Sequence, residues 1–166
     1  MFRAKTQQFI ALIFKLYKHC TVQNLLKLAY LSDYLYFEKT GQQLSGFTYR
    51  LYSFGPFDES IFSLLEELIA KQMISSHLNY TRNGLEYASY VFNDSVTDLK
   101  FKAEFIPLFS ILEFYTLREI LYEFFYYNEK ELTEMVYKSK PVRALGVAAP
   151  GESYGPGRLL EFKQGG

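Results

Sequence analysis

Residues 49–58, Tyr-Arg-Leu-Tyr-Ser-Phe-Gly-Pro-Phe-Asp, are the stretch around which the expected fold is organised. The first six residues alternate in side-chain direction, which is typical of a short β-strand. Gly55 permits unusual backbone angles and Pro56 lacks an N–H donor, so this pair predicts a sharp turn that ends the strand. Apolar residues then recur at helical spacing over about 58–72. The stretch predicts a strand, a turn and a helix.

Two amphipathic helices are expected upstream of this turn. Apolar side chains recur every three or four residues in 4–19, and again from Asn24 to about Thr40. Thr21 is the expected N-cap of the second helix. Gly41 is the expected left-handed residue that ends it.

Downstream of the turn, the sequence predicts a β-hairpin over 74–92 and then further helices. The hairpin strands alternate, and turn residues separate them. A short helix over 99–106 is expected to end near a proline. The segment 108–127 is apolar around most of its circumference, which favours a helix in the central core. If it were exposed, it would be an oligomer surface. Asn128 and Glu131 have the spacing of a capping box, which predicts a last helix.

These elements place the chain in the mainly α (α+β) class. We expect a compact helical domain with a short strand and a β-hairpin, in a winged-helix-like order. A length of 166 residues suits one domain, which we assign to 1–145. Residues 146–166 are rich in Gly and Pro without periodicity, and we interpret them as a flexible or surface-draped tail.

Charge is distributed unevenly along a chain whose net charge is zero. Residues 1–50 carry seven Lys or Arg and two Asp or Glu, whereas residues 51–100 carry three and seven. The basic front and the acidic middle could complement each other inside the fold, or they could mark two partner surfaces. The overall balance gives no argument for nucleic-acid or membrane binding.

The location that the sequence predicts is the cytoplasm. The single cysteine, Cys20, excludes an intramolecular disulfide and fits a reducing compartment. The N-terminus lacks the apolar core and cleavage site of a signal peptide, and no apolar run reaches the ~20 residues of a membrane span.

Residue patterns for catalysis are scarce. His19 and His77 have no neighbouring Cys or second His at metal-ligand spacing. The glycine-rich stretch 151–157 lacks the Gly-Lys-Ser/Thr ending of a phosphate-binding loop. We therefore expect no catalytic, cofactor-binding or metal-binding residues, and a protein that is not an enzyme.

DNA binding is the alternative function. A helix followed by the hairpin 74–92 is the order of a winged helix, in which 58–72 would be the recognition helix. That segment carries four acidic residues against Lys71, so phosphate repulsion opposes it. Nucleic-acid binding is possible but not favoured.

Three blocks of sequence carry a resemblance to a known family. They are Asn-Leu-Leu-Lys-Leu-Ala-Tyr-Leu-Ser-Asp at 24–33 with Gly41, Tyr-Ser-Phe-Gly-Pro-Phe at 52–57, and Glu-Leu-Thr-Glu-Met-Val-Tyr-Lys-Ser-Lys-Pro-Val at 131–142. Together they resemble the Panacea domain of SocA-like antitoxins. Part of the pattern is shared with the related YwgA-like proteins. Tyr137 and Val142 depart from it, since His and Trp are common there.

The resemblance implies a small cytoplasmic domain that neutralises a cognate toxin by direct contact, or that delivers the toxin to a protease as an adaptor. A toxin-like protein partner is therefore expected, and the many aromatic residues also allow a homo-oligomer. The motif positions could maintain the fold or contact the partner. They are Lys27, Leu28, Tyr30, Asp33, Gly41, Gly55, Pro56, Leu132 and Pro141.

Overall fold

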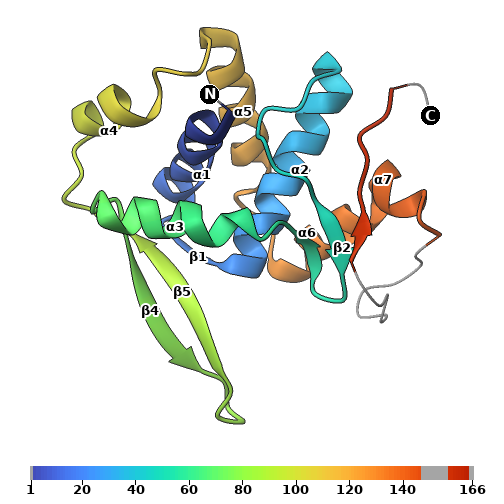
Figure 1. Cartoon of the computed structure of the whole chain (residues 1–166), viewed down its shortest axis with the longest axis horizontal. Coiled ribbons are helices and arrows are strands. Elements are labelled where there is room, and N and C mark those ends of the chain that lie inside the picture. The colour runs from blue at the N-terminus through green and yellow to red at the C-terminus, as the bar shows by residue number, and fades with distance from the viewer. Residues whose placement is uncertain (1, 147–156, 165–166) are drawn as a thin grey trace.

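The computed structural model describes residues 2–146 and 157–164. Within these residues the chain forms seven helices and two three-stranded antiparallel sheets (Figure 1). The mainly helical α+β class is thus confirmed. One contiguous hydrophobic core extends through the helices and includes residues of both sheets, among them Leu51 and Ile74.

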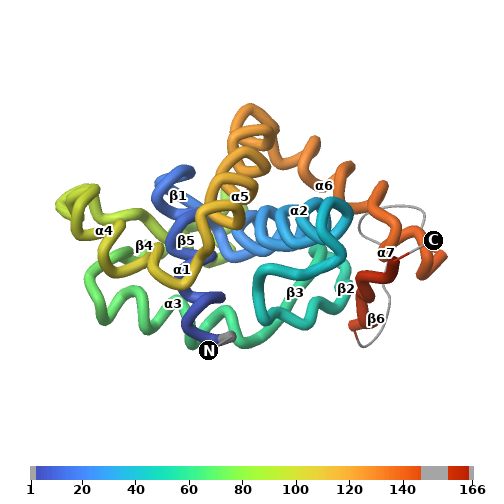
Figure 2. The backbone as a smooth tube through the Cα atoms, turned by 90° about the horizontal axis from the view of Figure 1, so that it is seen from above, coloured from blue at the N-terminus to red at the C-terminus, as the bar shows by residue number. Residues whose placement is uncertain are grey.

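Helix α2 (Val22–Thr40) is the centre of the fold. Figure 2 shows it between α5 and α6 on one side and β2 and β3 on the other, and it contacts all of these except β2 closely. The predicted caps are both present. The Thr21 hydroxyl oxygen accepts from the Asn24 N–H at 3.3 Å, and Gly41 has a φ of 75° and donates to Phe37 O at 2.7 Å.

Helix α1 (Phe2–Tyr17) packs against α2, as expected from its apolar spacing. It starts and ends two residues earlier than the predicted range 4–19. The chain turns sharply at Lys18, whose φ is 65°, and enters the short strand β1 (His19–Thr21). This strand was not predicted, because three residues are too few to show a period.

The predicted turn at Gly55 and Pro56 is wrong in one respect. β2 (Arg50–Tyr52) pairs with β3 (Gly55–Phe57), so the two residues begin a second strand instead of leading directly into a helix. Pro56 lies opposite Leu51 and is tolerated because β3 is an edge strand in the order β3-β2-β6. The expected helix follows as α3 (Ser60–Ala70).

The predicted hairpin is confirmed as β4 (Ile74–Tyr80) and β5 (Glu86–Phe92), with β1 on the other side of β5. Its tip extends away from the helical body (Figure 1). Helix α4 (Asp98–Phe105) follows, close to the predicted range 99–106. The winged-helix interpretation of this element order stays a prediction.

Helix α5 (Ile111–Phe124) differs from the prediction in position and in burial. It begins at Ile111, not at 108, because Ser110 and Glu113 form a capping box. The prediction that it lies in the central core is wrong. It lies at the periphery against α2, so only one of its faces is covered (Figure 2).

The C-terminal elements pack along α2, where Glu129 pairs with Lys27 and Lys140 pairs with Glu38. Helix α6 (Glu129–Lys138) has the predicted capping box, and the short α7 (Lys140–Arg143) follows it. β6 (Arg158–Leu159) pairs with β2, so this part of the predicted tail lies on the body. The segment 147–156, which belongs to the same predicted tail, lies outside the described residues.

The uneven charge of the chain is largely internal complementarity. Arg3 of α1 pairs with Glu67 of α3, and Lys15 pairs with Asp98 of α4. Further front-end bases pair with later acids, namely Lys5 with Glu113, Lys18 with Asp94 and Lys27 with Glu129. These bases are therefore neutralised within the chain, which weakens the alternative of two oppositely charged partner surfaces.

None of the helices in the described part of the chain combines the length and apolarity that crossing a bilayer requires.

Candidate functional site

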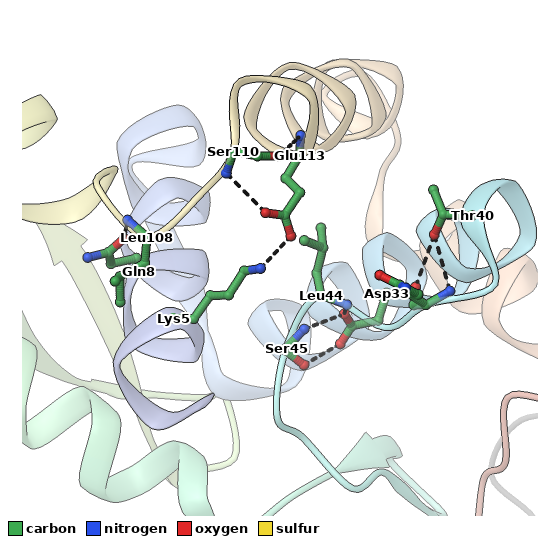
Figure 3. Close-up of polar contacts among 10 residues, drawn as sticks. Lys5, Gln8, Asp33, Thr40, Leu44, Ser45, Leu108, Ser110 and Glu113 are labelled. Atoms are coloured by element: carbon green, nitrogen blue, oxygen red, sulfur yellow. Dashed lines mark hydrogen bonds and ion pairs between the residues drawn. The ribbon is translucent and has the colours of Figure 1, made fainter. Parts of the chain in front are cut away.

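The predicted motif residues lie on α2 and beside it, and Asp33 binds the connector that follows α2. Its side chain is fully buried. Oδ1 accepts from the N–H groups of Leu44 at 3.1 Å and Ser45 at 2.9 Å (Figure 3). Oδ2 accepts from the hydroxyl groups of Ser45 and of Tyr49, the latter at 2.7 Å, and from Gln43 Nε2 at 3.3 Å. The carboxylate thus holds the whole connector between α2 and β2.

Burial shifts the pKa values of Asp33 and Tyr49. Desolvation raises the pKa of Asp33, and the hydrogen bonds from Ser45, Tyr49 and Gln43 oppose that rise. Desolvation and the adjacent Asp33 carboxylate raise the pKa of Tyr49 well above its ordinary value. Donors from the connector surround the buried Asp33 carboxylate, so the side chain holds the connector in place and has no access to a substrate.

Tyr30 joins α2 to the junction of α6 and α7. Its hydroxyl group lies 2.7 Å from Ser139 Oγ, which also donates to Val136 O at 2.5 Å. Its ring meets the Tyr49 ring edge-on, with centroids 5.3 Å apart. Two further motif residues are buried beside this junction, Leu132 on α6 and Pro141 on α7.

Lys27 and Gly55 form a second contact between motif positions. The Lys27 side chain is only 7% exposed, and its Nζ lies 3.7 Å from Glu129 Oε1. A Cβ added to Gly55 would meet Lys27 Cε at 3.4 Å, and Gly55 has a φ of 115°. Glycine fits here because the backbone is left-handed and the lysine stem packs over it. Leu28 and Pro56 are buried nearby.

The predicted motif residues therefore lie on α2 or pack against it, and Gly41 ends that helix. Most of these side chains are buried, which favours fold maintenance over partner contact. Residues 2–146 and 157–164 contain no group of three His, Cys, Asp or Glu placed to hold a metal. His19 and His77 are both exposed, and burial raises the pKa of the Cys20 thiol to about 12.

No residue on the outer face of α5 was among the predicted site residues, although an exposed oligomer surface was the alternative to core burial for this helix. Leu117, Ile120, Leu121 and Phe124 face the core. The opposite side exposes a stripe that we call the α5 face, with exposed fractions of 79% for Ile111, 74% for Leu112, 54% for Tyr115, 47% for Tyr122 and 88% for Tyr126. The spacing of these residues was the available signal, since they form one helical stripe and the buried residues form another.

Polar contacts at its first turn fix the rotation of α5. Glu113 accepts from the Ser110 N–H at 3.0 Å and pairs with Lys5 of α1 (Figure 3). This contact directs Glu113 toward α1 and leaves Leu112 pointing to solvent. Beside the face, a groove of about 530 Å³ runs between α1, α4 and α5, and Tyr115 and Tyr122 line it. The apolar exposure is therefore held in place by the fold.

Together, the fold and this surface define a mainly helical α+β domain that presents an exposed aromatic and aliphatic helix face. The chain belongs to the family described as antitoxin SocA-like, Panacea domain, whose model matches residues 25–141, more than two thirds of the 166 residues. The match spans α2 to α7 and includes every predicted motif position. No curated protein and no solved structure matches the chain.

Proposed function

We propose that this chain is a non-enzymatic antitoxin of the cytoplasm, which neutralises a cognate protein toxin by direct contact through the α5 face. One observation carries the proposal beyond the family. Five large side chains, Ile111, Leu112, Tyr115, Tyr122 and Tyr126, are exposed on one side of α5 and just beyond its end, while the opposite side of the helix is firmly packed. Contiguous exposed apolar patches on soluble domains mark sites of interaction.

The chemistry of the α5 face suits a protein partner. Aromatic side chains lose little conformational entropy on binding and dominate the energetics of interfaces. Tyr115, Tyr122 and Tyr126 also carry hydroxyl groups that can reach polar atoms of a partner. Arg118, Glu119 and Glu123 are exposed on the same helix, and Arg118 and Glu119 lie between Tyr115 and Tyr122, so the face also offers charged groups to a partner.

Neutralisation is tested with the product of the gene adjacent to this one. Co-expression with the full chain is expected to restore growth that the neighbouring protein alone inhibits, and the two are expected to co-purify. Leu112→Glu places a charge at the N-terminal end of the stripe and is expected to weaken binding at least tenfold, which is about 1.4 kcal/mol. Leu85→Glu, at the exposed hairpin tip, is the matched control and is expected to bind normally.

Two outcomes would contradict the proposal. One is a harmless neighbour that never co-purifies with the chain, and the other is a loss of binding in Leu85→Glu but not in Leu112→Glu. Toxin turnover separates the two modes of action, since an adaptor would shorten the lifetime of the toxin and a simple inhibitor would not. A salt-dependent mobility shift with upstream DNA would favour the regulator alternative instead.

Self-association through the α5 face also remains a prediction. Size-exclusion chromatography of the free chain and of Leu112→Glu would detect it as a concentration-dependent difference in apparent mass.

A further inference from the structure

The segment 157–164 lies along β2 as a third strand, beyond the end of the family match at residue 141 (Figure 1). Arg158 and Leu159 pair with Leu51 and Arg50. The Leu160 N–H donates to Tyr49 O at 2.9 Å, which extends the pairing by one residue. A surface inside the family domain is thus covered by a segment outside it.

An aromatic pocket anchors this segment. The Phe162 ring lies 5.8 Å from the ring of Tyr30, 5.6 Å from that of Phe37 and 6.2 Å from that of Tyr49, measured between centroids. Leu160 is buried next to it. The pocket therefore takes one large aromatic side chain, two residues after an aliphatic one.

The entrance to this site is also specific. A Cβ at Gly157 would lie 2.3 Å from Tyr52 Cζ, so only glycine passes the tyrosine ring without displacing it. Arg50 donates to Gly157 O at 3.1 Å, and Arg158 donates to Leu145 O at 3.0 Å. At its start the segment is thus held by one contact to its backbone, at Gly157 O, and by one contact from its Arg158 side chain.

Space remains beside the bound segment. A groove of about 570 Å³ lies between α2, α7 and residues 161–163, lined by Tyr34, Phe37, Pro141 and Phe162 among others. On its rim Lys140 pairs with Glu38 and Lys163 pairs with Glu161, both at 2.8 Å, so most of the rim charge is neutralised. A ligand longer than the segment would therefore find further apolar contacts there.

We infer that the β2 edge and the aromatic pocket form a docking site for an extended peptide with an aromatic anchor, and that the chain's own segment 157–164 occupies this site in cis. Strand addition at a sheet edge supplies backbone hydrogen bonds, and a side-chain pocket supplies specificity. A peptide from another protein with the same pattern, Leu-x-Phe in an extended conformation, would compete for the site. The inference does not depend on toxin binding at the α5 face.

The covalent tether favours the chain's own segment over a free peptide. A segment on a short tether has an effective concentration on the order of mM, so it resists a free peptide at μM concentration. Weakening the segment while keeping its receptor intact would open the site. Phe162→Ala removes the anchor, and Gly157→Val closes the entrance against Tyr52.

The test uses a fluorescently labelled peptide with the sequence Gly-Arg-Leu-Leu-Glu-Phe-Lys-Gln of residues 157–164 and the full-length chain. Anisotropy titrations are expected to show at least tenfold tighter binding to Phe162→Ala and to Gly157→Val than to the unmodified chain. A peptide with Ala in place of its Phe is expected to bind at least tenfold more weakly. Equal, negligible binding to all three chains, with circular dichroism showing intact helices, would overturn the inference.

A second measurement needs no substitution. In the unmodified chain, an excess of the unlabelled peptide is expected to accelerate hydrogen exchange at the Leu160 amide, because the displaced segment loses its bond to Tyr49 O. Amides within α2 are expected to keep their exchange rates. Exchange at Leu160 that does not change at mM peptide would count against a displaceable segment.

Discussion

The Tyr49 hydroxyl group donates a 2.7 Å hydrogen bond to Oδ2 of Asp33, and both side chains are buried. This bond fixes the residue before β2 to the middle of α2. Tyr49 also packs edge-on against Tyr30, which in turn contacts Ser139. Tyr30 and Tyr49 thus link Asp33 of the first motif block to Ser139 of the third through one continuous set of contacts.

Removing the Asp33 carboxylate should destabilise the chain strongly. Asp33→Ala leaves the N–H groups of Leu44 and Ser45 buried without an acceptor, so we expect a loss of about 3 kcal/mol or more in the free energy of unfolding. Asp33→Asn keeps one acceptor oxygen and should lose less, about 1–2 kcal/mol. Urea denaturation measures both. Asp94→Ala is the exposed control and should change stability by less than about 0.5 kcal/mol; a comparable loss there would discount the role of Asp33.

The pH dependence of stability should carry the signature of Asp33. Burial raises its pKa in the folded state above the unfolded value of about 3.9. Its contribution to stability is therefore fully present below pH ~3.9 and is lost as pH rises through the folded pKa. The difference in unfolding free energy between the native chain and Asp33→Asn should shrink over that range. A difference that grows with pH would mean that the hydrogen bonds outweigh desolvation.

Substitution of Gly55 should be costly because its φ of 115° disfavours any side chain. The new Cβ itself would meet Lys27 Cε at 3.4 Å, which is ordinary van der Waals contact. We expect Gly55→Ala to lower the free energy of unfolding by about 2 kcal/mol. Gly84→Ala is the control, since its φ of 78° is close to the left-handed helical region and no atom lies within 4 Å of the added Cβ. Thermal or urea unfolding measures both variants, and equal losses would mean that the φ of 115° adds no cost.

Tyr30→Phe tests whether a motif residue serves the fold or the partner. The substitution removes the 2.7 Å contact with Ser139 Oγ but keeps the ring packing. We expect a loss of about 1 kcal/mol in unfolding free energy with toxin neutralisation retained at temperatures where the chain is folded. Growth rescue and urea denaturation measure the two effects. Unchanged stability with lost neutralisation would assign Tyr30 to the interface.

Local signals predicted the elements that local chemistry controls. The Thr21 cap, the left-handed Gly41, the hairpin 74–92 and the capping box of α6 were all confirmed. The family assignment was confirmed by the same blocks. Each of these features is decided within a few residues, so periodicity and capping patterns are sufficient to show it.

Features that depend on distant partners could not be predicted in this way. β6 is a strand only because β2 offers it an edge more than a hundred residues earlier, and β1 depends on β5 in the same manner. Helix α5 is apolar around most of its circumference, which predicts burial on several sides, but α1 and α2 cover one face only. The position of a helix in the tertiary structure decides whether its apolar face meets the core or a partner. Sequence composition cannot distinguish the two cases, because it is the same in both.

The pairing of β6 with β2 also has a consequence for the order of synthesis. A ribosome adds about 5–20 residues per second, so the strand that covers β2 is made roughly 5–20 s after β2 itself. During that interval the nascent chain holds α2, its aromatic pocket and an uncovered β2 edge. In that time a free peptide with the Leu-x-Phe pattern would face no tethered competitor, so the arrival time of the last strand would decide which of the two is bound first.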